Sequence, residues 1–155
     1  MRSVEQLIAG HPFFVDLDEE TVRHLAGCAL NRHFDADEYL FRADDPAETF
    51  FLLRGGSVAI EIQGPGERRL IVETQGPGSV VGLSWLFPPY RHSMDARALS
   101  STSAVALDAG CLREKCDQDP RVGYLMLQRL ARAMHDRMMS ARVRLLDLYG
   151  APSAR

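Results

Sequence analysis

The stretch that decides the fold is Gly78–Ala98, which reads GSVVGLSWLFPPYRHSMDARA. An apolar, β-type run reaches Gly82, about one helical turn follows, and two prolines precede a second extended run. An Arg-His pair, Arg91 and His92, stands just before the second run. A glycine-marked break in a sheet, with a short helix and cations beside it, is typical of a site that holds something small.

Short β-type runs surround this break over residues 30–108. They are separated by DDP, GG, GPGE, GPGS and PP. The run SVAIEIQ alternates as a half-buried antiparallel strand should, and the GPGE loop then joins it to RRLIVET as a hairpin. Many short strands with Gly and Pro between them predict a sandwich or barrel.

Both ends of the chain are predicted to be helical. SVEQLIAG gives a short amphipathic helix ended by Gly10, and DLDEETVRHLAGCAL gives a second helix with Asp16 or Asp18 as its N-cap. After the strands, AGCLREKCDQ is predicted to form one short helix. A long helix follows from Pro120 to about Leu148, because proline suits the first helical position.

The long helix has an apolar stripe with steps of three and four residues, which is a heptad seam. A helix of about 28 residues spans about 42 Å, whereas a small domain is about 30 Å across. This length favours a homodimer over packing on the helix's own chain. The seam comprises Leu127, Leu130, Met134, Met138, Ala141, Leu145 and Leu148. The opposite face is predicted to carry Arg129, Arg132, Asp136, Arg137, Arg142 and Arg144.

Composition limits the class of protein. The 155 residues are 46% apolar, which suits one globular domain, and the net charge of −3 argues against a nucleic-acid surface over the whole protein. No apolar run approaches the roughly 20 residues of a membrane span, and the N-terminus lacks the apolar core of a signal peptide.

The three cysteines, Cys28, Cys111 and Cys116, are too few and too scattered for a disulfide framework or a four-ligand metal site. We expect ordinary thiols, as suits a reducing compartment. The cytoplasm is the expected location because the sequence shows neither a membrane span nor a signal peptide. Neither paired strand histidines nor a nucleophile–base pattern is present, so the sequence predicts no metal, no cofactor and no enzyme.

Three segments carry a family resemblance: HPFFVDLDEETVRHLA, DEYLFRADDPAETFFLLRGGSVAIEI and GPGSVVGLSWLF. They resemble the cyclic-nucleotide-binding domain of the catabolite-activator (Crp/Fnr) regulators, over about residues 10–148. The most specific part is the glycine pattern, with Gly55-Gly56 closing one strand pair and Gly78 and Gly82 bracketing the break. A stand-alone bacterial form without a DNA-binding domain is more similar still.

The resemblance implies an α+β fold: a β-roll or jelly roll, a cupin-like double-stranded β-helix, with short N-terminal helices and a long C-terminal dimerisation helix. Residues 1–155 would form one such domain. It would comprise N-terminal helices over 1–29, the roll over 30–108 with an altered phosphate-binding cassette at 78–93, and C-terminal helices over 109–149.

In the family, the cassette glycine is followed by a glutamate that binds the ribose, and later by an arginine and a serine or threonine at the phosphate. Here Gly82 matches the glycine, but Leu83 replaces the glutamate. His92 stands at the arginine position with Ser93 next, and Arg91 is one residue early. The candidate ligand-binding residues are therefore Gly82, Leu83, Ser84, Trp85, Arg91, His92 and Ser93.

The expected function is a small-molecule-sensing regulatory domain with a degenerate cassette. Its ligand would be cAMP, cGMP or another small effector, anionic or apolar, and its dimer helix would signal to an unidentified protein partner. The alternatives are a structural dimerising adaptor with a vestigial pocket, or the ligand-binding half of a Crp/Fnr-type transcription regulator. Because the chain stops shortly after the long helix and LYGAPSAR resembles a natural tail, we expect no sequence-specific DNA binding and no membrane association.

Overall fold

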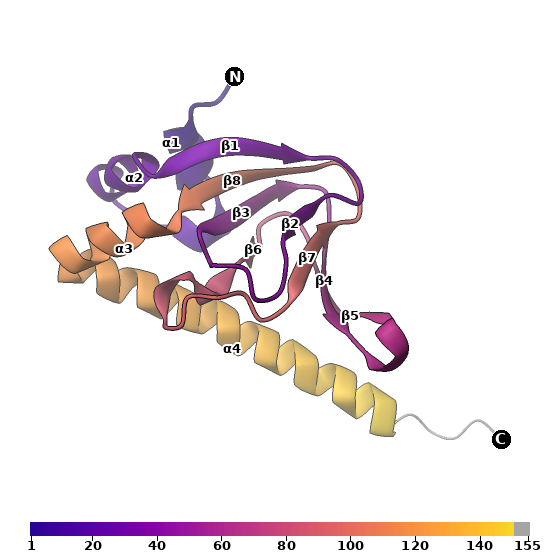
Figure 1. Ribbon diagram of the computed structural model, residues 1–155. Helices are drawn as coiled ribbons and strands as arrows, with labels where there is room; N and C mark the ends of the chain where they lie inside the picture. Colours follow the sequence, from indigo (N-terminus) through magenta and orange to yellow (C-terminus); the bar gives the residue numbers. More distant parts are fainter. Residues whose placement is uncertain (151–155) are drawn as a thin grey trace.

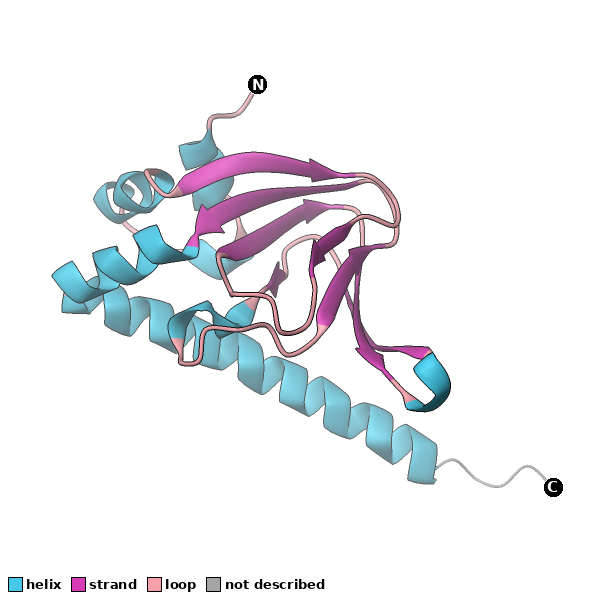
Figure 2. Ribbon diagram, viewed as in Figure 1, coloured by secondary structure: helices cyan, strands magenta, loops and turns pink. Residues whose placement is uncertain are grey.

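Eight antiparallel strands form two four-stranded sheets that face each other (Figures 1 and 2). The strand orders are β1-β8-β3-β6 and β2-β7-β4-β5. The computed structural model describes residues 1–150, and residues 151–155 of the predicted tail lie outside the described residues. The strands are β1 Ala29–Phe34, β2 Tyr39–Phe41, β3 Thr49–Gly55, β4 Val58–Gln63, β5 Arg69–Gln75, β6 Val80–Val81, β7 Asp95–Ala98 and β8 Thr102–Asp108. This architecture confirms the predicted β-roll, and the GPGE loop joins β4 to β5 as expected.

Two apolar cores lie on the two faces of β3. Phe51 and Leu53 point into the roll, whereas Phe50 and Leu52 pack under the helices. This alternation follows from the two-residue period of a strand. Strand β3 is therefore buried on both of its faces.

The N-terminal helices form where the sequence provides caps. In α1, Val4–Ala9, Ser3 and Gln6 form a capping box. In α2, Glu19–Ala26, the cap is Asp18 rather than Asp16. Between them lies the short 3₁₀ turn η1, Pro12–Phe14, and His11 ties this turn to β3 because its Nε2 lies 3.0 Å from the Leu53 carbonyl oxygen.

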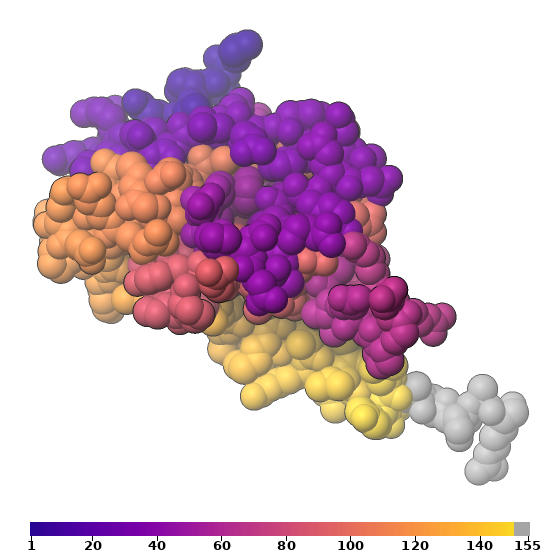
Figure 3. Space-filling view, viewed as in Figure 1, coloured from indigo at the N-terminus to yellow at the C-terminus, as the bar shows by residue number. Residues whose placement is uncertain are grey.

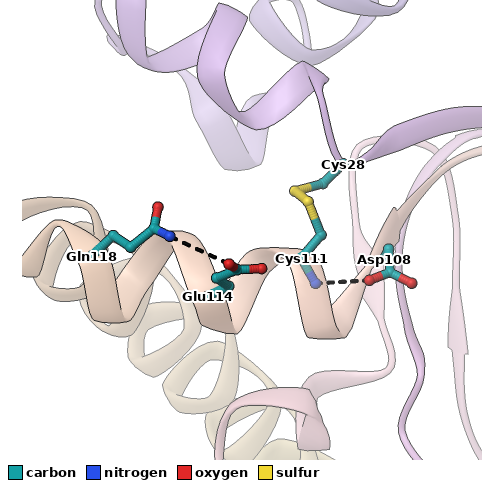
Figure 4. Close-up of a disulfide and its surroundings, with 5 residues drawn as sticks. All are labelled: Cys28, Asp108, Cys111, Glu114 and Gln118. Atoms are coloured by element: carbon teal, nitrogen blue, oxygen red, sulfur yellow. Dashed lines mark hydrogen bonds between the residues drawn. A yellow bond between two sulfur atoms is a disulfide. The ribbon is translucent and has the colours of Figure 1, made fainter.

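The cysteine prediction was wrong for two of the three residues. Cys28 follows α2 and Cys111 lies in the first turn of α3, Ala109–Gln118, where the two form a disulfide (Figure 4). Long-range pairing brings them together: the Asp108 N–H donates to the Cys28 carbonyl. Cys116 is a free thiol. The cysteines therefore give no support to a reducing compartment.

The long helix α4, Pro120–Gly150, begins as predicted and passes beneath the roll (Figure 1). In its first half, Val122, Met126 and Leu130 are buried in the core of their own chain. Leu130 is therefore not available to a partner helix, contrary to the predicted seam. The rest of the seam is exposed to solvent in the single chain: Leu127, Met134, Met138, Ala141, Leu145 and Leu148.

The predicted charged face of α4 was also partly wrong. Arg129 donates to the carbonyls of Phe13 and Val15, both at 2.7 Å. Arg137 and Arg144 likewise reach the roll. Arg137 and Arg144 lie on the roll-facing side because they follow Leu130 at seven-residue intervals, which keeps these three residues on one stripe. Arg129 instead contacts the N-terminal segment.

Candidate functional site

A cavity of about 790 Å³ lies between the break in the roll and the second half of α4. We call it the groove. Figure 3 shows the second half of α4 against the lower edge of the roll, beside the β4–β5 hairpin. The residues that line the groove come from the cassette (Gly82, Leu83, Ser84, Phe87, Ser93), from the adjoining Met94, from strands (Phe41, Ile60, Val72, Glu73) and from α4 (Met134, Arg137, Met138, Ala141, Arg144, Leu145, Leu148). A volume of this size is within the range of small-ligand sites.

Gly82 turns the chain from β6 into the short helix η3, Leu83–Leu86, which forms the cassette wall of the groove. Its φ of 86° is in the left-handed region that favours glycine. A Cβ here would also lie 2.9 Å from the Thr49 carbonyl oxygen. The sequence needs glycine at this position for the cassette to leave the sheet, and Leu83 and Ser84 then face the groove.

Trp85 does not line the groove, contrary to its predicted place in the site. Its side chain is 0% exposed and belongs to the core under the helices, with its ring centroid 5.7 Å from that of Phe50. Its carbonyl accepts from Arg113 at 2.7 Å. Trp85 therefore anchors the cassette to the core.

The two predicted phosphate cations also lie away from the groove. His92 is 4% exposed, and its ring stacks on Phe41 with centroids 3.6 Å apart and planes 9° apart. Phe41 lines the groove and His92 does not, so Phe41 covers the histidine. Burial lowers the pKa of His92, against a smaller opposing effect of Asp45, so its ring is neutral at pH 7. Arg91 instead donates to the Asp44 carbonyl at 2.6 Å.

Of the seven predicted ligand-binding residues, the structure brings four to the groove: Gly82, Leu83, Ser84 and Ser93. Ser84 and Ser93 contribute hydroxyl groups, while Leu83 adds apolar surface where the family has a carboxylate. The cassette wall therefore presents two small polar groups and no charge.

The charges of the groove come from residues that the sequence interpretation had placed elsewhere. Arg137 of α4 donates to the Val80 carbonyl, and its Nε lies 3.8 Å from a Glu73 carboxylate oxygen. Its side chain is 19% exposed; burial lowers the pKa of the guanidinium, and Glu73 partly offsets this. Arg144 donates to the Val72 carbonyl. The seven-residue spacing from Leu130 was the signal that could have revealed both arginines.

Over residues 1–150, no group of three or more His, Cys, Asp or Glu side chains is arranged to hold a metal ion. Over the same residues, no helix is long and apolar enough to cross a membrane. The groove therefore combines an apolar surface with the hydroxyl groups of two serines, the guanidinium groups of two arginines and one carboxylate.

Comparison with known protein families shows which family this sequence belongs to. Residues 31–119 match the model of the cyclic nucleotide-binding domain. The chain belongs to that family.

The curated relatives that this chain matches are much longer proteins. Cyclic nucleotide-gated ion channel 18 of Arabidopsis thaliana is 29% identical over 132 residues, which cover 79% of this chain and 19% of the channel. The chain spans about a fifth of the length of the first curated relatives it matches.

Two solved structures show the same fold. A protein from Geobacter metallireducens GS-15 has a TM-score of 0.79 and 25% identity, over 89% of this chain and 99% of that one. The catabolite activator protein of Thermus thermophilus has a TM-score of 0.69 and 23% identity, over 90% of this chain and 63% of that one.

Proposed function

We propose that the chain is a small-molecule-sensing regulatory domain and that its ligand binds in the groove. The observation that carries this proposal is the groove itself, which lies between Gly82 and α4 and is lined by apolar side chains with a few converging polar groups. Such a cavity is the usual form of a ligand site.

The ligand is not bound as a standard cyclic nucleotide. Leu83 offers no acceptor to a ribose, His92 is neutral beneath Phe41, and Arg91 is held by Asp44. A hydrogen bond to a charged group contributes about 1.5–3 kcal/mol. Losing two of them weakens binding by roughly a hundredfold to more than ten-thousandfold. We therefore expect cAMP and cGMP to bind weakly, and another effector to be preferred.

The second half of α4 links the groove to the outside of the molecule. Three apolar residues of α4 line the groove and are about half exposed: Met134, Met138 and Leu145. A ligand that contacts them therefore changes the apolar surface that α4 presents to a partner protein. We propose that the partner is a second copy of the chain, which covers the exposed seam. The dimer would then pass the signal to a further protein.

Two alternatives remain distinct from this proposal. In the first, the chain is a dimerising adaptor whose pocket is vestigial, which the bridge between Arg137 and Glu73 across the groove favours. In the second, the chain is the ligand-binding half of a Crp/Fnr-type transcription regulator, which the likeness to the Thermus thermophilus protein favours. We propose no catalytic activity, and we retain the cytoplasm as the expected location.

Native mass spectrometry of the purified protein separates a sensor from an adaptor. We expect a bound small molecule in the wild type and its loss in Ala141→Trp, because the indole would fill the groove. His135→Trp places the same side chain on α4 outside the groove and is expected to retain the ligand. A wild type without any bound species, or one that keeps it in Ala141→Trp, contradicts the proposal.

A further inference from the structure

Arg137 is an incompletely satisfied cation at the groove. A guanidinium has five N–H donors in a fixed planar arrangement. Among the described residues, the acceptor of its one hydrogen bond is the Val80 carbonyl. Glu73 lies 3.8 Å from Nε, which is an ion-pair distance and beyond a hydrogen bond. Several donors are therefore available to an anion that enters the groove.

The groove is positively charged in a protein that is negative overall. Its charged lining residues are Arg137, Arg144 and Glu73, which leave one net positive charge. The whole chain carries −3. Because Arg137 is largely removed from water, it gains more from an anion than a surface arginine does. This local excess favours an anionic ligand.

The rest of the groove favours an apolar ligand body. Leu83 and Ile60 form one side, and Met134, Met138 and Leu145 of α4 form the other. Methionine side chains are flexible and polarisable, so they adapt to apolar groups of different shapes. An uncharged apolar ligand would use this surface but would leave Arg137 without an anion.

We propose that the groove binds an amphipathic anion, with its carboxylate or phosphate on Arg137 and its apolar body between the cassette and α4. This inference rests on the proposed function and names the ligand class. The anion takes the place of Glu73 at the guanidinium. The charge that binds the ligand thus comes from α4 and not from the cassette.

Calorimetry on the full chain with octanoate, octyl phosphate, octanol and octylamine tests the proposal. These probes share one apolar chain and differ in the head group. We expect at least one anion to bind at least tenfold more tightly than octanol, and the tighter anion identifies the preferred head group. We expect octylamine to bind no more tightly than octanol. Equal binding of the anions and octanol would overturn the anion site while leaving an apolar ligand groove.

Single substitutions at Arg137 and Glu73 test where the anion binds in the groove. Arg137→Gln should weaken binding of the preferred anion at least tenfold and leave octanol binding unchanged, whereas Arg142→Gln, an exposed arginine outside the groove, should change neither. Glu73→Gln removes the competing carboxylate and should tighten anion binding severalfold, which damage to the fold would not do. Unchanged anion binding in Arg137→Gln, or no gain in Glu73→Gln, would overturn the proposal. If no probe binds and native mass spectrometry also finds no ligand, the proposed function fails with it.

Discussion

The two walls of the groove are built differently. The cassette wall is fixed to the core, because Trp85 is fully buried and Arg113 holds its carbonyl. The helix wall, from Met134 onwards, reaches the roll through Arg137 and Arg144 and leaves its apolar side chains about half exposed. A wall with few buried contacts is the one that moves at low cost. The cassette therefore fixes one wall of the groove, whereas α4 supplies both of its cations.

The largest expected difference between the walls is in stability. Trp85→Ala removes a fully buried aromatic side chain and should lower the free energy of unfolding by about 3–5 kcal/mol. Leu148→Ala changes an exposed groove residue on α4 and should change it by about 0.5 kcal/mol or less. Urea unfolding monitored by circular dichroism measures both. Similar losses in the two variants would show that the helix wall is as firmly packed as the cassette.

The next effect concerns association through the helix wall. Met138→Glu and Leu127→Glu each place a carboxylate in the exposed apolar seam and should weaken a dimer at least tenfold, about 1.4 kcal/mol. Leu127 does not line the groove, so its variant separates association from ligand binding. Gln128→Glu is the matched control on another side of α4.

Sedimentation velocity at micromolar concentration reports the outcome. The wild type and Gln128→Glu should sediment as dimers, and the two seam variants should shift towards monomer. A monomeric wild type would mean that α4 serves only its own roll.

The smallest expected effect is a pH dependence of the folding stability, which arises from His92 in the cassette. Burial lowers the pKa of His92 in the folded protein, so the unfolded chain takes up a proton near pH 6.5 before the folded protein does. Stability is therefore greatest above about pH 6.5 and declines as the pH falls towards 5. His11 adds to this trend, since burial also lowers its pKa. Urea unfolding at several pH values should show a shallower decline in His92→Gln, and an unchanged decline would show that His92 does not contribute.

The structural features that are set by residues close together in the sequence could be predicted. The Asp18 cap, the hairpin at Gly64–Glu67 and the start of α4 at Pro120 each follow from local backbone preferences. The family resemblance then predicted a β-roll between the helices, and the structure confirmed it.

The parts that depend on distant contacts were not predictable in the same way. Nothing in the local sequence brings Cys28 to Cys111, because that pairing depends on β1 meeting β8. Phe41 covers His92 from a strand far away in the chain. Arg137 was assigned to a solvent face because charged residues usually lie there, although its spacing from Leu130 places it against the roll. The chemistry of the site was therefore harder to predict than its position.

We propose that this domain keeps the family's ligand site but has lost the cassette chemistry for cyclic nucleotides. Calorimetric titration with cAMP of the wild type and of the double variant Leu83→Glu, His92→Arg tests it most directly. Glutamate restores a ribose acceptor on the groove wall, and arginine restores a cation that binds phosphate through two donors. We expect weak wild-type binding and a gain of at least about 30-fold, or about 2 kcal/mol, in the double variant. Tight binding of cAMP by the wild type, or no gain in a folded double variant, would contradict the account.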